Sequence, residues 1–305
     1  MNNPSMASKQ PYSDEFIALK IEGAPRLASL RSIGAALNEL VYAENSFTSQ
    51  IAEVIRRDPS LTSRLLKLVN SVFFGLSQRV NNIEEAIFYL GLRQIRELAL
   101  ATPIIEDFER LHGGALKNAP WHKLWRHSIG CGIMSREILS LSGLTFEDDT
   151  DYIVGLIHNV GKIVAASIFP AAFGKILAAN LQTESEVLAM EIELIGWDHA
   201  RIGAFYLERH HLGPEIVQPV RWYNDPPLAG DFEKSAAAVN LADCLVRVAG
   251  VESFDIAGNI TEDEIIALPS WKILFGSKNE IEAEALKESL RTSIQRLPGV
   301  LKGML

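Results

Sequence analysis

The sequence predicts an all-helical protein made of two helical subdomains. Apolar residues recur at steps of three and four along most of the chain, which is the period of a helix with one buried face. The first clear run of this kind comprises Leu27, Leu30, Ile33, Leu37 and Leu40. Residues that favour helix starts and ends flank these runs, and the alternating pattern of a half-buried strand is almost absent.

Composition and turn signals divide the chain into three parts. Residues 1–22 are polar and aperiodic, so we expect a poorly ordered lead-in. The Gly-rich segment at residues 112–120 ends in a proline and is the clearest internal boundary. We therefore expect a first helical subdomain over residues 23–115 and a second one, with a helical tail, over residues 116–305.

The polar residues of the first subdomain mark where its helices begin and end. Asp58 followed by Pro59 supplies an N-cap and a proline at the first helical position. Asn82 begins a short helix that ends near Gly91, a residue that tolerates the backbone conformation of a helix C-terminus. A longer helix is expected over residues 92–111.

The second subdomain carries a series of amphipathic helices separated by Pro, Gly and polar turns. The expected helices cover residues 120–141, 149–167, 170–180, 185–195, 198–210, 214–223 and 233–249. Two or three more are expected from there to the end of the sequence.

Composition limits the class of protein. The chain has 305 residues, of which 48% are hydrophobic and 22% charged, as is typical of globular proteins. No apolar run approaches the roughly 20 residues of a bilayer-spanning helix, and the N-terminus lacks the basic and apolar regions of a secretory signal. Cys131 and Cys244 are far apart and form no CxxC pair. We interpret both as small core residues of a protein in the reducing cytoplasm.

The charge of the chain disfavours nucleic acid as a partner. The formal net charge is -9, whereas nucleic-acid binders neutralise several phosphates with clustered Lys and Arg. The basic residues here are scattered singly or in pairs. A small nucleotide or phosphate ligand stays compatible with this charge, because one phosphate group needs only two or three donors.

Two adjacent polar residues, His158 and Asn159, interrupt an apolar helical run over residues 152–162. One interpretation is a buried pair that is hydrogen-bonded to neighbouring helices. The other is part of a metal site, which would need further ligands from elsewhere in the chain.

Four segments of this sequence resemble the HDOD family, a branch of the HD metal-phosphohydrolase superfamily whose metal site has decayed. They are DPSLTSRLLKLVNS at residues 58–71, NNIEEAIFYLGLRQIRELAL at 81–100, YIVGLIHNVGK at 152–162 and WDHARIGAFYLERHHLGPEIVQPVRW at 197–222. The resemblance covers roughly residues 25–250. It implies two helical subdomains, the second a degenerate HD core.

The resemblance also implies a set of ligand positions. An HD enzyme holds its ion with a histidine on an early helix, an adjacent His-Asp pair, and an aspartate on a late helix. The matching residues here are His127, His158 with Asn159, and Asp243. Asn159 offers one neutral carbonyl oxygen in place of a carboxylate, so we expect metal affinity to fall steeply. His127, His158 and Asp243 are left as a three-ligand set.

Simpler interpretations of the candidate pocket residues stay open. His127 could be an interface histidine bonded to a backbone carbonyl, and Asp243 could form a surface ion pair with Arg247 four residues later. His199 could join the pocket or stabilise a helix junction. Lys162 covers a phosphate in active relatives or is a solvated lysine near a helix turn, and we favour the second interpretation.

The resemblance implies a function in bacterial signal transduction. We expect a non-catalytic, cytoplasmic regulatory module with a protein partner, no membrane or nucleic-acid partner, and no cofactor. Relatives carry two histidines near the positions of Trp222 and Tyr223. We interpret Trp222 and Tyr223 themselves as core or groove aromatics. The alternative is a residual metal-dependent phosphohydrolase or cyclic-nucleotide phosphodiesterase that uses a divalent transition metal.

Overall fold

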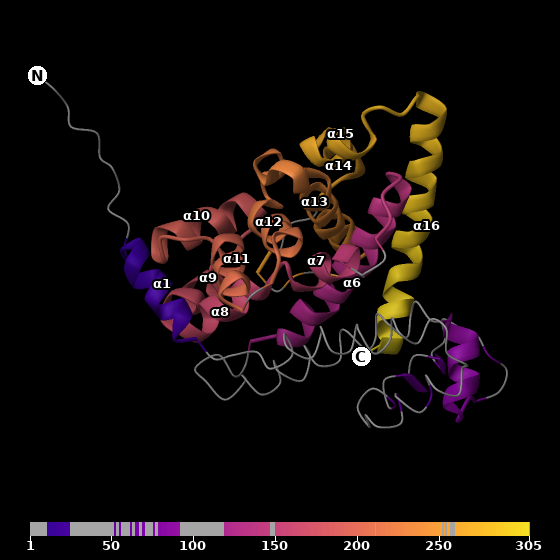
Figure 1. The fold of residues 1–305 in the computed structure, drawn as a ribbon, viewed down its shortest axis with the longest axis horizontal. Coiled ribbons are helices and arrows are strands. Elements are labelled where there is room, and N and C mark those ends of the chain that lie inside the picture. The colour runs from indigo at the N-terminus through magenta and orange to yellow at the C-terminus, as the bar shows by residue number, and fades with distance from the viewer. Residues whose placement is uncertain are drawn as a thin grey trace, which may run out of the picture.

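The computed structural model confirms the all-helical fold (Figure 1). It describes residues 11–24, 79–91, 119–146, 150–210, 212–251 and 260–304, together with single positions between 52 and 76 and residues 253, 255 and 256. Every regular element within these residues is a helix. The boundary expected at residues 112–120 and the helix expected over 92–111 lie almost wholly outside them, so the division into two subdomains stays a prediction.

The helices of the second half follow the expected order along the chain. Residues 83–91 are also helical, as expected from Asn82 and Gly91. The labelled elements are α1 (Asp14–Glu22), α6 (Trp121–Leu141), α7 (Thr150–Ile157), α8 (Val160–Ile168), α9 (Pro170–Ala178), α10 (Glu184–Leu194), α11 (His199–Arg209), α12 (Pro214–Trp222), the 3-10 helix η2 (Pro226–Phe232), α13 (Glu233–Val248), α14 (Glu262–Ala267), α15 (Pro269–Phe275) and α16 (Glu280–Met304).

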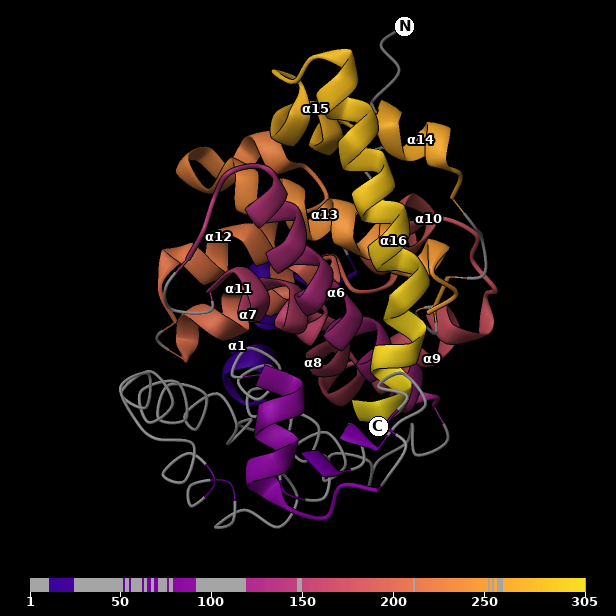
Figure 2. The same cartoon turned by 90° about the vertical axis from the view of Figure 1, so that its right-hand side faces the viewer.

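Helix α6 lies at the centre of the second half. It packs against α7 on one side and α13 on another, and the long α16 runs beside it (Figure 2). Ile129, Cys131 and Ile138 of α6 are fully buried. Because α7 and α13 both contact α6, polar side chains at the right positions of these three helices meet in the core.

Helices α8 and α11 approach each other at two glycines, Gly161 and Gly203. A Cβ atom on Gly161 would lie 1.8 Å from the carbonyl oxygen of His199 and 2.7 Å from the backbone nitrogen of Gly203. No side chain larger than hydrogen fits such a contact. The two helices therefore pack backbone to backbone just after the His158–Asn159 turn.

The expectation of a poorly ordered lead-in over residues 1–22 is wrong for residues 14–22. These residues form α1, whose N-terminus is capped by the Ser13 side chain, and α1 lies against α8 and α11 (Figure 1). Ile17 and Ile21, one helical turn apart, are buried there. The indole nitrogen of Trp197 donates to the Asp14 carboxylate at 2.7 Å. Two buried isoleucines are therefore enough to hold α1 in place, because α8 and α11 supply the apolar surface against which they pack.

One helix was expected over residues 149–167, but the structure has two, α7 and α8, separated at His158 and Asn159. Asn159 has φ −89° and ψ 9°, outside the helical range. The Nδ1 atom of His158 donates to the carbonyl oxygen of Gly155 at 2.6 Å, which a helical N–H would otherwise take. The break turns both polar side chains toward the interior.

No single helix in the described parts of the chain is long and apolar enough to cross a membrane. One pair of neighbouring segments, Thr150–Ile168 and Pro170–Ala178, reaches that length and composition together, and these segments are bent by 117° relative to each other.

Candidate metal centre

Four side chains from three segments meet in the core, and we call them the His/Cys/Asp cluster. His127 and Cys131 come from α6, His158 from the turn between α7 and α8, and Asp243 from α13. One ligand atom from each lies within 4.8 Å of all the others, and all four residues are buried. The expected convergence of His127, His158 and Asp243 is therefore observed.

The two histidines of the cluster are held in the same way. The Nδ1 atom of His127 lies 3.0 Å from the carbonyl oxygen of Val251, and Nδ1 of His158 lies 2.6 Å from that of Gly155. A carbonyl oxygen only accepts, so both Nδ1 atoms carry hydrogen. Both Nε2 atoms lie near Oδ1 of Asp243, at 2.8 Å and 3.7 Å. This arrangement, with Nδ1 bonded outward and Nε2 directed inward, is typical of metal-binding histidines.

Asp243 is both a cluster member and an ion-pair partner. Its Oδ2 atom lies 2.8 Å from the guanidinium of Arg247. The ion pair expected at this spacing exists, but it is buried rather than on the surface. Burial alone would raise the pKa of Asp243, but Arg247 and the bond to His127 hold this pKa well below its usual range. Burial lowers the pKa of His158 despite the nearby Asp243 carboxylate.

Asn159 stands where the resemblance places a carboxylate. Its Nδ2 atom donates to Nε2 of His158 at 2.8 Å. Its Oδ1 atom is buried and has no hydrogen-bond partner among the described residues. An unsatisfied buried carbonyl oxygen costs about 1–3 kcal/mol. The amide therefore occupies the lone pair of His158 while leaving its own acceptor unused.

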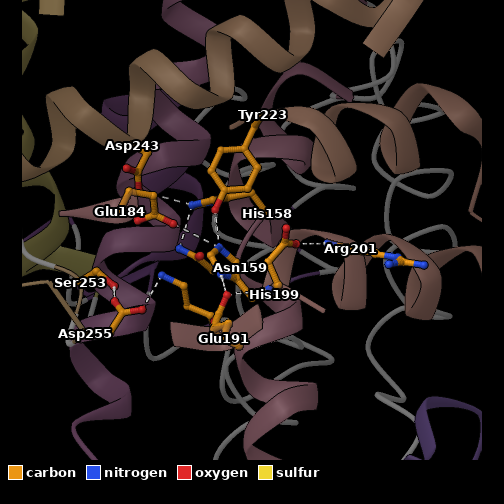
Figure 3. A network of polar contacts seen from close by, with 12 residues as sticks. His158, Asn159, Glu184, Glu191, His199, Arg201, Tyr223, Asp243, Ser253 and Asp255 are labelled. Carbon is orange, nitrogen blue, oxygen red and sulfur yellow. Dashed lines mark hydrogen bonds and ion pairs between the residues drawn. The ribbon is translucent and has the colours of Figure 1, made fainter. Parts of the chain in front are cut away.

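The interpretation of Lys162 as a solvated lysine is wrong. Its side chain is only 2% exposed, and Nζ lies 2.6 Å from Oδ2 of Asp255. Asp255 also accepts a bond from the Ser253 hydroxyl (Figure 3). Burial alone would lower the pKa of Lys162, but Asp255, Glu184 and Glu191 raise it above its usual value. The segment after α13 supplies Asp255, whose sequence position gave no sign of this contact.

His199 stabilises a helix junction, one of the two roles that the sequence left open, and it also contacts a residue beside His158. Its Nδ1 atom and its backbone N–H both donate to Oε2 of Glu191, at 2.7 Å and 2.8 Å, which joins α10 to α11. Its Nε2 atom meets the hydroxyl of Tyr223, whose ring lies edge-on to His158 with centroids 5.2 Å apart (Figure 3). Burial alone would lower the pKa of His199, but Glu191 and Glu184 raise it above its usual value.

Cys131 is the cluster residue that sequence reasoning missed. The interpretation as a core residue holds, since it is fully buried, but its sulfur also lies 3.3 Å from Nε2 of His127. Burial, with the carboxylate of Asp243, raises the pKa of its thiol well above the usual value. A signal was present, because residues four apart share one face of a helix.

The described residues thus define an all-helical protein with a buried candidate metal site. The family model of the HDOD domain matches residues 27–226. That is more than half of the chain, which therefore belongs to the HDOD family.

Solved structures agree with this fold. An HDOD domain protein of unknown function from Geobacter sulfurreducens superimposes with a TM-score of 0.69 at 20% identity, over 94% of this chain and 99% of that one. A protein of Shewanella amazonensis SB2B, provisionally called a phosphohydrolase, gives 0.65 at 24% identity, over 94% and 96%. One of Marinobacter aquaeolei VT8, provisionally called a signal transduction protein, gives 0.65 at 21%, over 93% and 60%.

A curated relative gives no further information on activity. It is an uncharacterized protein of Treponema pallidum (strain Nichols), 27% identical over 237 residues. These residues are 76% of this chain but only 44% of the relative. This chain thus spans less than half the length of that protein.

The HD superfamily is metal-dependent, and the residues present fit one ion better than two. His127, His158 and Asp243 would hold a single divalent transition metal through two nitrogens and one oxygen. Such an ion, when bound, supplies Lewis acidity. A second ion would need the bridging carboxylate that Asn159 lacks.

Proposed function

We propose that this chain is a regulatory HDOD module of bacterial signal transduction that acts in the cytoplasm, without catalysis, by binding a protein partner. The observation that carries this proposal is that the charged side chains of the pocket already form ion pairs with one another. Lys162 is bonded to Asp255, and Asp243 is bonded to Arg247 and His127. A hydrolytic site needs an open coordination position and cations that are free to hold a phosphate.

The same pairing limits what small ligand the pocket could take. A nucleotide or phosphate would have to replace Asp255 as the partner of Lys162, or Asp243 as the partner of Arg247. Both ion pairs are buried, and breaking one leaves an uncompensated charge. We therefore rank a protein partner above a phosphate ligand.

The alternative is a residual metal-dependent phosphohydrolase. The observation in its favour is the cluster itself, because its four ligand atoms lie within 4.8 Å of one another. A structure from Shewanella amazonensis with a TM-score of 0.56 and 18% identity is provisionally called a metal-dependent phosphohydrolase, which supports the fold of this candidate and not its activity.

Hydrolysis assays on the full chain decide between the two. Cyclic dinucleotides, a generic phosphodiester and a phosphomonoester would each be tested with manganese, iron, cobalt and zinc. We expect no turnover that depends on Asp243, so wild type and Asp243→Asn should give the same background rate. Metal-dependent turnover that Asp243→Asn abolishes would favour the alternative.

A further inference from the structure

We propose that Cys131 is the fourth ligand of a closed, single-ion transition-metal site formed with His127, His158 and Asp243, and that zinc is the ion this donor set fits. This inference extends the proposed non-catalytic function, because a site with four protein ligands leaves no position for the water that hydrolysis needs. The metal measurements below do not depend on that function being correct.

The ligand atoms lie close enough together to surround one ion, because all of them are within 4.8 Å of one another. With zinc bond lengths of about 2.0–2.3 Å, neighbouring ligand atoms stand about 3.3–3.5 Å apart. Nε2 of His127 lies 3.3 Å from the sulfur of Cys131 and 2.8 Å from Oδ1 of Asp243, and Nε2 of His158 lies 3.7 Å from the same oxygen. These three separations are close to those around a zinc ion, so small side-chain adjustments would bring the atoms to bonding distance.

A close contact between the backbones of α6 and α7 fixes the position of Cys131. A Cβ atom on Gly155 would lie 2.4 Å from the carbonyl oxygen of Cys131, so α7 meets α6 at this residue with no side chain between them. Cys131 also shares the face of α6 that carries His127, one turn earlier. The thiol therefore points into the cluster from a rigid part of the core.

Each of the other ligands is oriented by a second bond. Val251 and Gly155 accept from the Nδ1 atoms of His127 and His158, and Arg247 holds Oδ2 of Asp243. Partners of this kind direct the other atom of each ligand at an ion, and at His158 the ion would replace the Asn159 amide as the partner of Nε2. Asp243 is left with Oδ1 alone, which makes it a single-oxygen ligand.

The Cys131 thiolate supplies the negative charge that the HD ligand set takes from its second carboxylate, where this chain has Asn159. A thiolate from Cys131 and a carboxylate from Asp243 together neutralise a divalent cation, and the two imidazoles add no charge. Coordination releases the thiol proton to solvent. Arg247, which is bonded to the other oxygen of Asp243, lies outside the four ligands and adds one positive charge beside them.

The thiolate also selects the metal. Sulfur ligands favour zinc over magnesium, calcium and manganese, which prefer oxygen. Sites with four protein ligands drawn from Cys and His are typical of structural zinc. Residue 159 is an amide and not a carboxylate, and residue 131 supplies a thiol. Both features favour a closed site over an open hydrolytic one.

Cobalt titration of the full chain, after removal of bound metal, tests the assignment. Cobalt replaces zinc and reports its ligands, so wild type should show a thiolate-to-cobalt charge-transfer band and the intense visible bands of tetrahedral cobalt. The charge-transfer band should be lost in Cys131→Ser and kept in Cys244→Ser. Cys244 is the matched control, because it is also buried but is not a member of the cluster.

X-ray absorption at the zinc edge gives a second readout that needs no variant, so the test survives if Cys131→Ser fails to fold. One zinc–sulfur distance of about 2.3 Å per ion is expected. A weak six-coordinate cobalt spectrum without a charge-transfer band would overturn the assignment of Cys131 and favour the hydrolytic alternative. Absence of any stoichiometric binding would overturn the metal site while leaving the non-catalytic function standing.

Discussion

Nε2 of His127 lies 2.8 Å from Oδ1 of Asp243, although 116 positions separate the two residues in the chain. Nδ1 of His127 already donates its hydrogen to Val251. Both groups are buried, and Nε2 of His127 also lies 3.3 Å from the sulfur of Cys131. The contact joins α6 to α13 and fixes two members of the His/Cys/Asp cluster relative to each other.

The first prediction is that Asn159→Asp raises metal affinity. A carboxylate beside His158 adds one negative charge next to the ion, and it removes the amide that now donates to Nε2 of His158. We expect an increase of about ten- to a hundredfold in affinity for a divalent transition metal, the size of effect that residues around a metal site commonly have. Calorimetric titration of both proteins measures it.

Asn279→Asp is the control for this titration. Asn279 caps the exposed start of α16, where its side chain accepts from the backbone of Glu282 at 3.0 Å, and aspartate caps equally well. The control adds the same charge outside the cluster and should leave the affinity unchanged. Equal affinities of wild type and Asn159→Asp would show that residue 159 is not at a ligand position.

The fold and the candidate ligand positions could be predicted because they depend on local periodicity and on a motif with a fixed order. His127, His158 and Asp243 were found in this way. Asp255 was not, because only the path of the chain after α13 brings it to Lys162. Cys131 was assigned to the core alone because the family pattern contains no thiol.

The second prediction concerns the buried pair of Lys162 and Asp255. Lys162→Met or Asp255→Asn alone leaves one buried charge without its partner and should lower the free energy of unfolding by about 3–5 kcal/mol. The double variant should lose less than the sum of the two. Chemical denaturation of wild type, the two single variants and the double variant gives the coupling free energy between Lys162 and Asp255.

A surface ion pair provides the comparison for these variants of Lys162 and Asp255. Arg209 lies 3.1 Å from Glu22, and both side chains are largely exposed. Arg209→Met should change the stability little, because solvent screens such pairs. If the two single variants at Lys162 and Asp255 behave like Arg209→Met, the buried pair does not form in solution.

The third prediction is that stability falls as pH rises through the pKa of His199. The carboxylates of Glu191 and Glu184 raise this pKa in the folded state above its ordinary value of about 6.5. A raised pKa stabilises the fold fully below the unfolded value, and this contribution is lost as pH rises through the folded value. The histidine ring signals in NMR spectra report the titration directly.

The spectrum of His199→Gln identifies the His199 signal by its absence, and His122→Gln, at an exposed position of α6, controls for loss of a histidine elsewhere. The titration midpoint of His199 should lie above 6.5, and the free energy of unfolding of wild type should decline over the same pH interval. A midpoint below that value would mean that burial outweighs the two carboxylates, and the predicted direction would then be wrong.

The last prediction is that Gly161→Ala destabilises the protein far more than Gly23→Ala. The added methyl at Gly161 would lie 1.8 Å from the carbonyl oxygen of His199, so the backbones of α8 and α11 must separate. Overpacking in a core costs typically about 1–3 kcal/mol, and a clash with backbone should lie at or above the upper end.

At Gly23 the nearest atom would be 3.6 Å away and φ is −83°, so alanine fits there without strain. Thermal unfolding compares the two variants. Because Gly161 follows the His158–Asn159 turn directly, Gly161→Ala should also weaken cobalt binding by displacing His158. Equal unfolding midpoints for Gly161→Ala and Gly23→Ala would show that α8 and α11 are not in backbone contact at Gly161.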